Sequence, residues 1–202
     1  IDTRFPVQFV IRPQRADFPD YRGYAGRVAG GVLRVGDEIM VLPSGLTSTI
    51  TGIDSPTGPL QEATPGQAVT VLLADDLSIT RGDMICRPNN RPRVSQELEA
   101  MLCWMDDTAP LQPGKIYSIK HTTKVARTKI TEVLYRLNIS TLSRETGVNQ
   151  LAMNEIGRVT LHTTAPLMFD DYHQNRTTGC FIIVDESTGQ TAGAGMLLSP
   201  RT

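Results

Sequence analysis

Few residues in this chain of 202 have the types and spacing that chemistry requires. Asp170, Asp171 and His173 stand close together and offer carboxylate and imidazole groups, which bind metals or transfer protons. The histidines, however, have no histidine or cysteine at metal-ligand spacing, and neighbouring acids in a turn are usually only solvated. No serine or cysteine has a nearby base that would make it a nucleophile. We therefore expect neither a metal site nor a catalytic residue in this chain.

Two short motifs are typical of functional sites, but both are better explained as turns. Residues 20–23 match D-x-x-G, which GTPases use near the γ-phosphate, yet the sequence contains no G-x-x-x-x-G-K-[ST] phosphate-binding loop. Residues 81–83 spell Arg-Gly-Asp between two apolar segments, where a tight turn between strands is expected. Neither motif therefore predicts nucleotide binding or cell adhesion.

The strongest charge feature is a basic run between residues 108 and 131, which contains no aspartate or glutamate. Its cations are Lys115, Lys120, Lys124, Arg127 and Lys129. Such a run is typical of a surface that meets an acidic protein or a phosphate backbone, although a solvated face of strands and loops has the same pattern. Tyr117 is the only aromatic residue within it, which is poor for base stacking. We predict that these cations bind a partner, and nucleic acid is not favoured.

A second candidate contact is the segment 170–176, which is expected to join two strands. It brings Tyr172, Asn175 and Arg176 together within seven residues, beside two acids. Arginine and tyrosine are favoured at interface hot spots because each combines buried area with directed hydrogen bonds. The alternative is structural, with Arg176 held at a barrel end by Asp170 or Asp171. The sequence leaves both interpretations open.

Charge and composition exclude several classes of protein. Twenty lysine and arginine residues oppose 21 aspartate and glutamate residues, so no overall field would gather nucleic acid or an anionic membrane. No apolar run approaches the ~18 residues that a membrane span needs. The three cysteines are widely spaced, and the first residues show no signal-peptide pattern. We expect a cytoplasmic fragment of a longer protein, without a disulfide framework.

Alternation of apolar and other residues with a period of two dominates the sequence. In segments 5–11 and 133–139 every second residue is large and apolar, which predicts strands with one buried face. The continuous apolar runs 39–42 and 69–73 predict strands buried on both faces. Glycine and proline, at 17 and 13 residues, mark turns between many short segments. This pattern is typical of a β-sandwich or a β-barrel.

One segment allows two interpretations, and another marks a boundary. Residues 95–105 contain too many consecutive apolar residues for one helical face, so a strand is favoured over a helix that Ser95 would cap. Residues 87–93 are polar and contain Pro88 and Pro92, which interrupt a sheet because proline has no amide donor. We place the domain boundary here and predict two small β-domains, 1–90 and 91–202.

Three segments of the first domain carry a resemblance to a known family. Residues 26–39 read Gly-Arg-Val-Ala-Gly-Gly-Val-Leu-Arg-Val-Gly-Asp-Glu-Ile, which is similar to the barrel hairpin of domain two in the translation-factor GTPases. Residues 65–69 and 79–83 fall where that family has its A-G-x-x-V and I-x-R-G segments. The resemblance implies an all-β fold with two consecutive antiparallel β-barrels, as in domains two and three of elongation factor Tu-like GTPases.

Other segments narrow the resemblance. Residues 4–8, 100–105 and 192–196 are similar to the large subunit of ATP sulfurylase, the GTPase subunit of bacterial sulfate adenylyltransferase. The blocks Asn-Glu-Ile-Gly-Arg-Val at 154–159 and Asn-Arg-Thr-Thr-Gly-Cys-Phe-Ile at 175–182 are its most specific parts. Together these blocks span nearly the whole chain, which resembles domains two and three of that subunit.

This resemblance implies a division of labour between the chain and its partners. The family binds GTP and Mg²⁺ in an N-terminal GTPase domain, which this chain lacks, so we expect no cofactor here and no GTP binding by the chain alone. A smaller catalytic subunit makes adenylyl sulfate from ATP and sulfate, and GTP hydrolysis drives that step. The expected partners are therefore the GTPase domain and the catalytic subunit, with no membrane contact.

Two other functions stay open at this point. The barrels of a translation elongation factor would hold aminoacyl-tRNA, and the basic run is the feature that such a function would use. A free-standing β-barrel that binds an unrelated ligand is the third possibility. The near-neutral net charge and the block at 154–159 favour the adenylyltransferase subunit over both.

Overall fold

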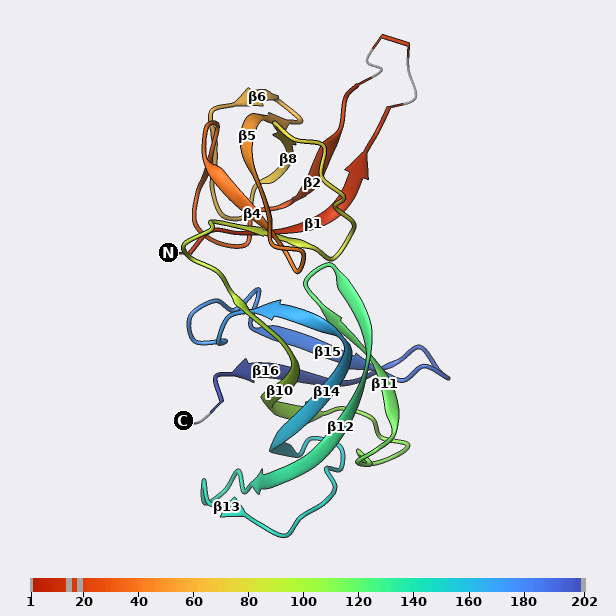
Figure 1. Ribbon diagram of the computed structural model, residues 1–202. Coiled ribbons are helices and arrows are strands. Elements are labelled where there is room, and N and C mark those ends of the chain that lie inside the picture. The colour runs from red at the N-terminus through yellow and green to blue at the C-terminus, as the bar shows by residue number, and fades with distance from the viewer. Residues whose placement is uncertain (1, 14–15, 18–19, 201–202) are drawn as a thin grey trace. The chain divides into compact units, whose positions relative to one another are not determined.

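The computed structural model describes residues 2–13, 16–17 and 20–200, which form two compact units (Figure 1). One unit comprises Ile1–Pro92 and the other Arg93–Thr202. The described residues form strands joined by turns and loops, and they include no helix that is long and apolar enough to cross a membrane. The predicted all-β class is confirmed.

The first unit is a closed antiparallel barrel. Its strands are β1 (Arg4–Ile11), β2 (Gly23–Arg27), β3 (Leu33–Arg34), β4 (Glu38–Leu42), β5 (Leu46–Ser55), β6 (Gly58–Leu60), β7 (Glu62–Ala63), β8 (Ala68–Leu73) and β9 (Met84–Cys86). Six of them follow the order β4-β9-β1-β2-β8-β5, and pairing of β4 with β5 closes the ring. Closure removes the edge strands, and apolar side chains such as Phe5, Ile39 and Ile85 fill the interior.

Strand β1 departs from the predicted alternation halfway along its length. Phe5 and Val7 are fully buried, but Phe9 is 57% exposed and Ile11 is also exposed. The register against β2 shifts between Val7 and Phe9, which is a β-bulge. An extra residue at a bulge turns the following side chains to the other face, so Val10 packs toward the core instead. The prediction of one continuous buried face over 5–11 is therefore wrong beyond Val7.

The two continuous apolar runs behave differently. All four residues of 39–42 are buried, as predicted. In β8 only Val69 and Val71 are buried, whereas Thr70 and Leu72 are partly exposed. Burial on both faces is therefore wrong for 69–73, because only alternate side chains of β8 point into the barrel.

The second unit is also a closed antiparallel barrel. Its strands are β10 (Arg93–Trp104), β11 (Ile116–His121), β12 (Lys124–Leu137), β13 (Arg144–Glu145), β14 (Ile156–Phe169), β15 (Cys180–Val184) and β16 (Thr191–Leu198). The order β11-β15-β16-β10-β14-β12 is closed by pairing of β11 with β12. Two consecutive barrels are thus confirmed.

The segment 95–105 lies mostly within β10 and contains no helix. Leu98, Ala100, Leu102 and Trp104 alternate into the core of the barrel. The intervening residues, Met101 and Cys103 among them, face outward. The apolar run is continuous because both faces of the strand carry apolar side chains, and only one of those faces belongs to the core.

The predicted alternation over 133–139 holds only at its start. Val133 is buried in β12, but the strand ends at Leu137 and Ile139 is 63% exposed. The register against β14 shifts twice, between Ile130 and Glu132 and between Val133 and Tyr135. These bulges break the period of two, so that Tyr135 and Leu137 are only half-buried.

Candidate partner-binding groove on the second barrel

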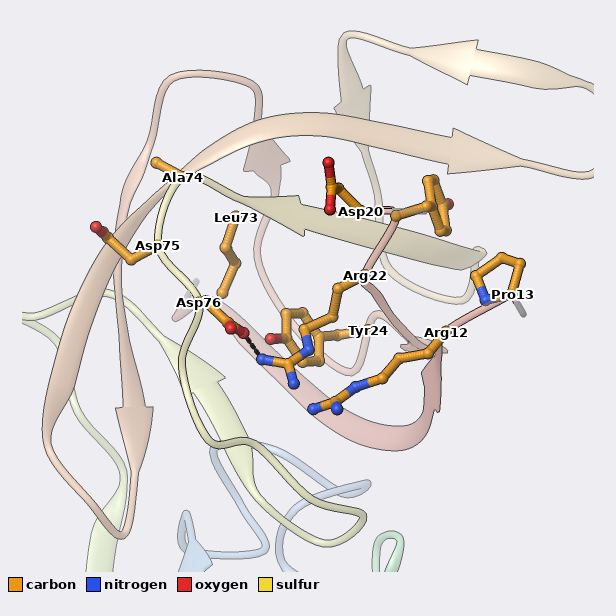
Figure 2. A pocket seen from close by; sticks show the side chains of 10 residues that line it. Arg12, Pro13, Asp20, Arg22, Tyr24, Leu73, Ala74, Asp75 and Asp76 are labelled. Carbon is orange, nitrogen blue, oxygen red and sulfur yellow. Dashed lines mark ion pairs between the residues drawn. The ribbon is translucent and has the colours of Figure 1, made fainter. Parts of the chain in front are cut away.

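The D-x-x-G segment of the first barrel lines a polar pocket of about 430 Å³ (Figure 2). Two of its charges are paired with one another: the Arg22 guanidinium forms an ion pair with Asp76. Tyr21 donates a hydrogen bond of 2.7 Å to Asp54, outside the pocket, and burial together with this bond raises the Tyr21 pKa to about 12. Asp20 lies in a turn and Gly23 begins β2, so the segment leads into a strand and only its first residue is in the predicted turn.

The Arg-Gly-Asp tripeptide is also a turn, as predicted. Gly82 has a φ of 95°, which favours glycine, and the Asp83 amide donates to the Thr80 carbonyl oxygen at 3.1 Å. The Asp83 carboxylate accepts the Thr80 amide at 3.0 Å and so closes the turn.

The outer face of the second barrel carries a different kind of surface. Strand pairing places outward side chains from β10, β16 and β15 in two adjacent rows, which are Met101–Met196–Cys180 and Cys103–Ala194–Ile182. Ala194 is the small member among larger neighbours. Its short side chain leaves a hollow between them, and a groove of about 730 Å³ lies over these strands.

Two glycines allow the backbone around this groove to lie close. A Cβ atom on Gly195 would overlap the ring of Phe181, which fills the barrel interior beneath it. A Cβ atom on Gly179 would lie 2.5 Å from the Cα of Tyr172 and 2.6 Å from the Asn175 carbonyl oxygen. The sequence therefore has glycine where the floor of the groove meets the core and where the loop 170–179 folds back on itself.

The loop 170–179 is held by its own side chains. Asp170 accepts a hydrogen bond of 2.7 Å from the Thr178 hydroxyl. Asp171 accepts the amides of His173 and Ser199, each at 2.9 Å. Burial disfavours the charged form of Asp171, but these donors outweigh it and lower its pKa below the ordinary value.

A buried histidine supports the same loop from inside the barrel. His121 on β11 is 1% exposed, and its Nε2 lies 2.6 Å from the Thr178 carbonyl oxygen. Burial lowers the pKa of His121, although the contact with Thr178 and the charge of Asp170 act in the other direction. The neutral ring with its proton on Nε2 donates this hydrogen bond.

Three of the eight predicted contact residues meet at the groove. Lys120 on β11 lines it together with Tyr172 and Arg176 from the loop. Among the described residues Arg176 forms no ion pair, so it is not held by Asp170 or Asp171. Asn175 has a local task instead: its Oδ1 accepts the amides of Thr177 and Thr178, both at 3.0 Å.

The other cations of the basic run do not join this group. Lys115 forms an ion pair of 3.1 Å with Asp185, and Arg127 forms one with Glu186. Lys124 is half-buried at the start of β12, and Lys129 is exposed on β12 opposite Ile116 and His162. The run is therefore spread along a hairpin, and part of its charge is balanced by the turn that follows β15.

The floor of the groove is not predictable from the sequence. Met101, Cys103, Ile182 and Met196 are apolar residues that point away from the core, and the sequence does not distinguish them from core residues. One signal was available: the segment Ala-Gly-Ala-Gly at 192–195 has no bulky side chain, so a strand formed there must leave space beside it.

Two family models match this tandem of closed barrels, and they place the chain in a class, the β-barrel portions of translation-factor-type GTPases. The family model described as Elongation factor Tu domain 2 matches residues 24–86. The chain belongs to the GTP-eEF1A C-terminal domain-like family, whose model matches residues 97–198.

Curated relatives confirm the predicted resemblance to sulfate adenylyltransferase subunits. The chain is 52% identical over 198 residues to the Bifunctional enzyme CysN/CysC of Mycobacterium tuberculosis, covering 98% of this chain and 32% of that protein. It is 42% identical to Sulfate adenylyltransferase subunit 1 of Bacteroides fragilis, covering 98% of this chain and 40% of that protein. The corresponding protein of Aeromonas hydrophila is 44% identical, with coverage of 97% and 40%. The chain thus spans about a third to two fifths of these relatives.

Solved structures agree on the fold. The structure of sup35 complexed with GDP superposes with a TM-score of 0.87 at 15% identity, covering all of this chain and 48% of that one. The sup35 complex with GMPPNP gives a TM-score of 0.85 at 16% identity, with the same coverage. At these identities the likeness describes the fold of the barrels alone.

Proposed function

We propose that this chain is the non-catalytic two-barrel portion of the GTPase subunit of a sulfate adenylyltransferase. In that role it supports GTP-driven formation of adenylyl sulfate from ATP and sulfate in the cytoplasm. The observation that carries the proposal is 42–44% identity over 97–98% of the chain to proteins named Sulfate adenylyltransferase subunit 1.

The barrels then link two activities that lie outside the chain. An N-terminal GTPase domain binds GTP with Mg²⁺, and a smaller catalytic subunit adenylylates sulfate. Closed barrels suit this supporting role because every core strand is paired on both sides, so the surface keeps its shape while a neighbour changes state. A groove between fixed strands is a natural contact for such a neighbour.

The groove at Lys120, Tyr172 and Arg176 is the partner contact in this proposal. Its loop is already ordered by the hydrogen bonds of Asp170, Asp171 and Asn175. Binding to an ordered loop avoids the entropic cost of fixing its backbone, which is about 1–2 kcal/mol for each residue. Tyrosine and arginine on such a loop have the character of interface hot spots.

The aminoacyl-tRNA alternative is less well supported. It would use the basic run, but carboxylates hold Lys115 and Arg127. Counterion release by phosphate contacts needs cations that are free to pair with phosphates. The groove also offers an apolar floor, which does not suit a phosphate backbone.

A binding experiment separates the two functions. The full-length protein that contains this chain is titrated with the catalytic subunit and, separately, with aminoacyl-tRNA. We expect a complex with the catalytic subunit that weakens about tenfold, or ~1.4 kcal/mol, in the Tyr172→Ala and Arg176→Ala variants. The matched Lys129→Ala variant, an exposed cation outside the groove, should bind like the parent. Tight binding of aminoacyl-tRNA without binding of the subunit would overturn the proposal.

A further inference from the structure

The floor of the groove is apolar although it faces outward. Met196 is 37% exposed and Cys180 is exposed, while Met101, Cys103 and Ile182 beside them are half-buried. Outward positions on an antiparallel barrel normally carry polar side chains. These apolar side chains are neighbours across three paired strands, so they offer another molecule one continuous surface.

Methionine at two of these positions suits a floor that adapts to its occupant. Met101 and Met196 are cross-strand neighbours on β10 and β16. Their unbranched side chains change rotamer readily and fill irregular gaps. The short side chain of Ala194, between Cys103 and Ile182, leaves the floor of the groove lowest at this point.

The rim of the groove is positively charged. Lys120 and Arg176 both line it, and its described lining contains no aspartate or glutamate. In the part of the chain that the structure describes, neither cation forms an ion pair, in contrast to Lys115 and Arg127. The complementary ligand therefore carries an apolar group next to a negative charge.

The loop that supplies Tyr172 and Arg176 is fixed before any ligand arrives. The Tyr172 amide donates to the Leu197 carbonyl oxygen on β16 at 2.9 Å. The carbonyl oxygen of Thr178 contacts the buried ring of His121. Thus both ends of the loop are hydrogen-bonded to the barrel, and the backbone that carries Tyr172 and Arg176 is held in place.

From these observations we infer that the groove receives an extended polypeptide segment of the partner subunit. In that segment an apolar side chain enters the hollow over Ala194, and an adjacent carboxylate pairs with Lys120 and Arg176. This inference rests on the proposed function, which supplies the partner subunit. It goes further by naming the chemistry of the segment and the site that receives it.

The cysteines of the chain provide the test. Cys180 lies in the groove and is exposed, whereas Cys86 is fully buried in the first barrel and serves as an internal control. The full-length protein is alkylated with iodoacetamide at about pH 8.5, near the ordinary thiol pKa. The rate at each cysteine is measured by mass spectrometry for the free protein and in the presence of saturating catalytic subunit.

We expect the subunit to slow alkylation of Cys180 at least tenfold and to leave Cys86 unchanged. The Lys120→Glu and Arg176→Glu variants should each raise the subunit concentration needed for protection about tenfold, with unchanged thermal unfolding. The Lys129→Glu variant reverses an exposed charge outside the groove and should behave like the parent.

Several outcomes would overturn the inference. If the complex forms and Cys180 stays as reactive as before, the groove is not the docking site, although the proposed function stands. If no complex forms, the proposed function and this inference fail together. If Cys180 is alkylated more slowly in the free full-length protein than in the 202-residue chain, the protein's own GTPase domain covers the groove. A Cys180 alkylation rate that falls as the protein concentration rises would indicate that a second copy of the protein covers the groove. Protection of Cys180 by tRNA instead of the subunit would indicate that the groove binds RNA.

Discussion

The Arg127 guanidinium donates two hydrogen bonds to the carboxylate of Glu186, one from Nε and one from Nη2, each 2.8 Å long. This fork-like geometry satisfies both groups and lowers the pKa of Glu186. Arg127, which belongs to the basic run between residues 108 and 131, is therefore already paired with a carboxylate.

Removing the charge of Glu186 should release Arg127 for other anions. We predict that Glu186→Gln elutes from heparin at higher salt than the parent. Thermal unfolding should change little, because exposed ion pairs stabilise proteins weakly.

The control for this prediction is Glu132→Gln. It removes the same charge from an exposed acid that has no ion-pair partner among the described residues. Equal heparin elution for the two variants would show that Arg127 was not held back by Glu186.

Burial of His121 predicts a pH-dependent stability. Its pKa in the folded chain lies below the ordinary value of 6.5, so the unfolded chain takes up the proton first as pH falls. The stability that this neutral ring contributes is present above about pH 6.5 and is lost as pH falls toward the folded-state pKa. Urea unfolding between pH 7.5 and 5.5 should show this loss in the parent and a smaller one in His121→Gln. The exposed His173→Gln variant should keep the parental slope, and an equal change in both variants would contradict this prediction.

Gly195 joins the groove to the barrel core. An added Cβ would overlap Phe181, and close packing leaves this ring little room to move. We predict that Gly195→Ala lowers the free energy of unfolding by roughly 1–3 kcal/mol, measured by urea titration. Gly45 lies at a turn, and an added Cβ there would meet no atom within 4 Å. It is not a matched control, because its φ of 80° would itself strain an alanine at this position.

The appropriate control is Ala194→Gly, the outward neighbour, which changes one methyl group without entering the core. It should cost less than Gly195→Ala. A Gly195→Ala variant as stable as the parent would mean that Phe181 has more freedom than the packing indicates.

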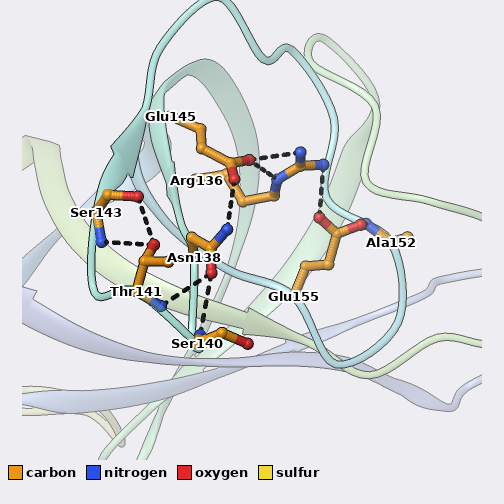
Figure 3. Close-up of polar contacts among 8 residues, drawn as sticks. All are labelled: Arg136, Asn138, Ser140, Thr141, Ser143, Glu145, Ala152 and Glu155. Atoms are coloured by element: carbon orange, nitrogen blue, oxygen red, sulfur yellow. Dashed lines mark hydrogen bonds and ion pairs between the residues drawn. The ribbon is translucent and has the colours of Figure 1, made fainter.

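Polar contacts hold the loop after β12 in place (Figure 3). Arg136 pairs with Glu145 and Glu155, and Asn138 Oδ1 accepts the amides of Ser140 and Thr141. The loop fixed in this way gives Leu142 a φ of 56°, while its side chain is 74% exposed. A left-handed backbone is costly for leucine, and exposure means that little packing offsets the cost.

We therefore predict that Leu142→Asn raises the free energy of unfolding by about 0.5–1 kcal/mol, because asparagine tolerates the left-handed region. The urea midpoint should rise without a change in slope. Leu142→Ala removes the side chain without relieving the backbone, so it should not give this gain. Equal effects of the two substitutions would mean that the side chain, not φ, determines the result.

The period of two and the dense turns were enough to predict strands, and the resemblance to a known family predicted two barrels. Details that depend on pairing were not predictable. The bulge that exposes Phe9 arises from the register of β1 against β2, and nothing in residues 5–11 marks it. Arg4 at the start of the same strand is 1% exposed because the Thr3 and Asn90 carbonyl oxygens accept from its guanidinium at 2.8 and 2.7 Å. A partner as distant in the sequence as Asn90 cannot be read from a local pattern.

The candidate site was predictable to a similar degree. The residue types of Tyr172 and Arg176 predict a contact site, and both residues share a groove with Lys120. The floor was missed because Met101, Cys180 and Met196 become neighbours only through the pairing of β10, β16 and β15. The pairing of Lys115 with Asp185 was missed for the same reason, since the two are 70 residues apart.

The most direct measurement is the rate of adenylyl sulfate formation by the full-length protein together with its catalytic subunit, with and without GTP. We predict that GTP stimulates adenylyl sulfate formation by the parent. At a fixed limiting concentration of the subunit, this stimulation should be about tenfold smaller in the Tyr172→Ala and Arg176→Ala variants. Both variants should unfold at the parental temperature. Adenylyl sulfate formation that is indifferent to GTP in the parent would contradict the proposed role of these barrels.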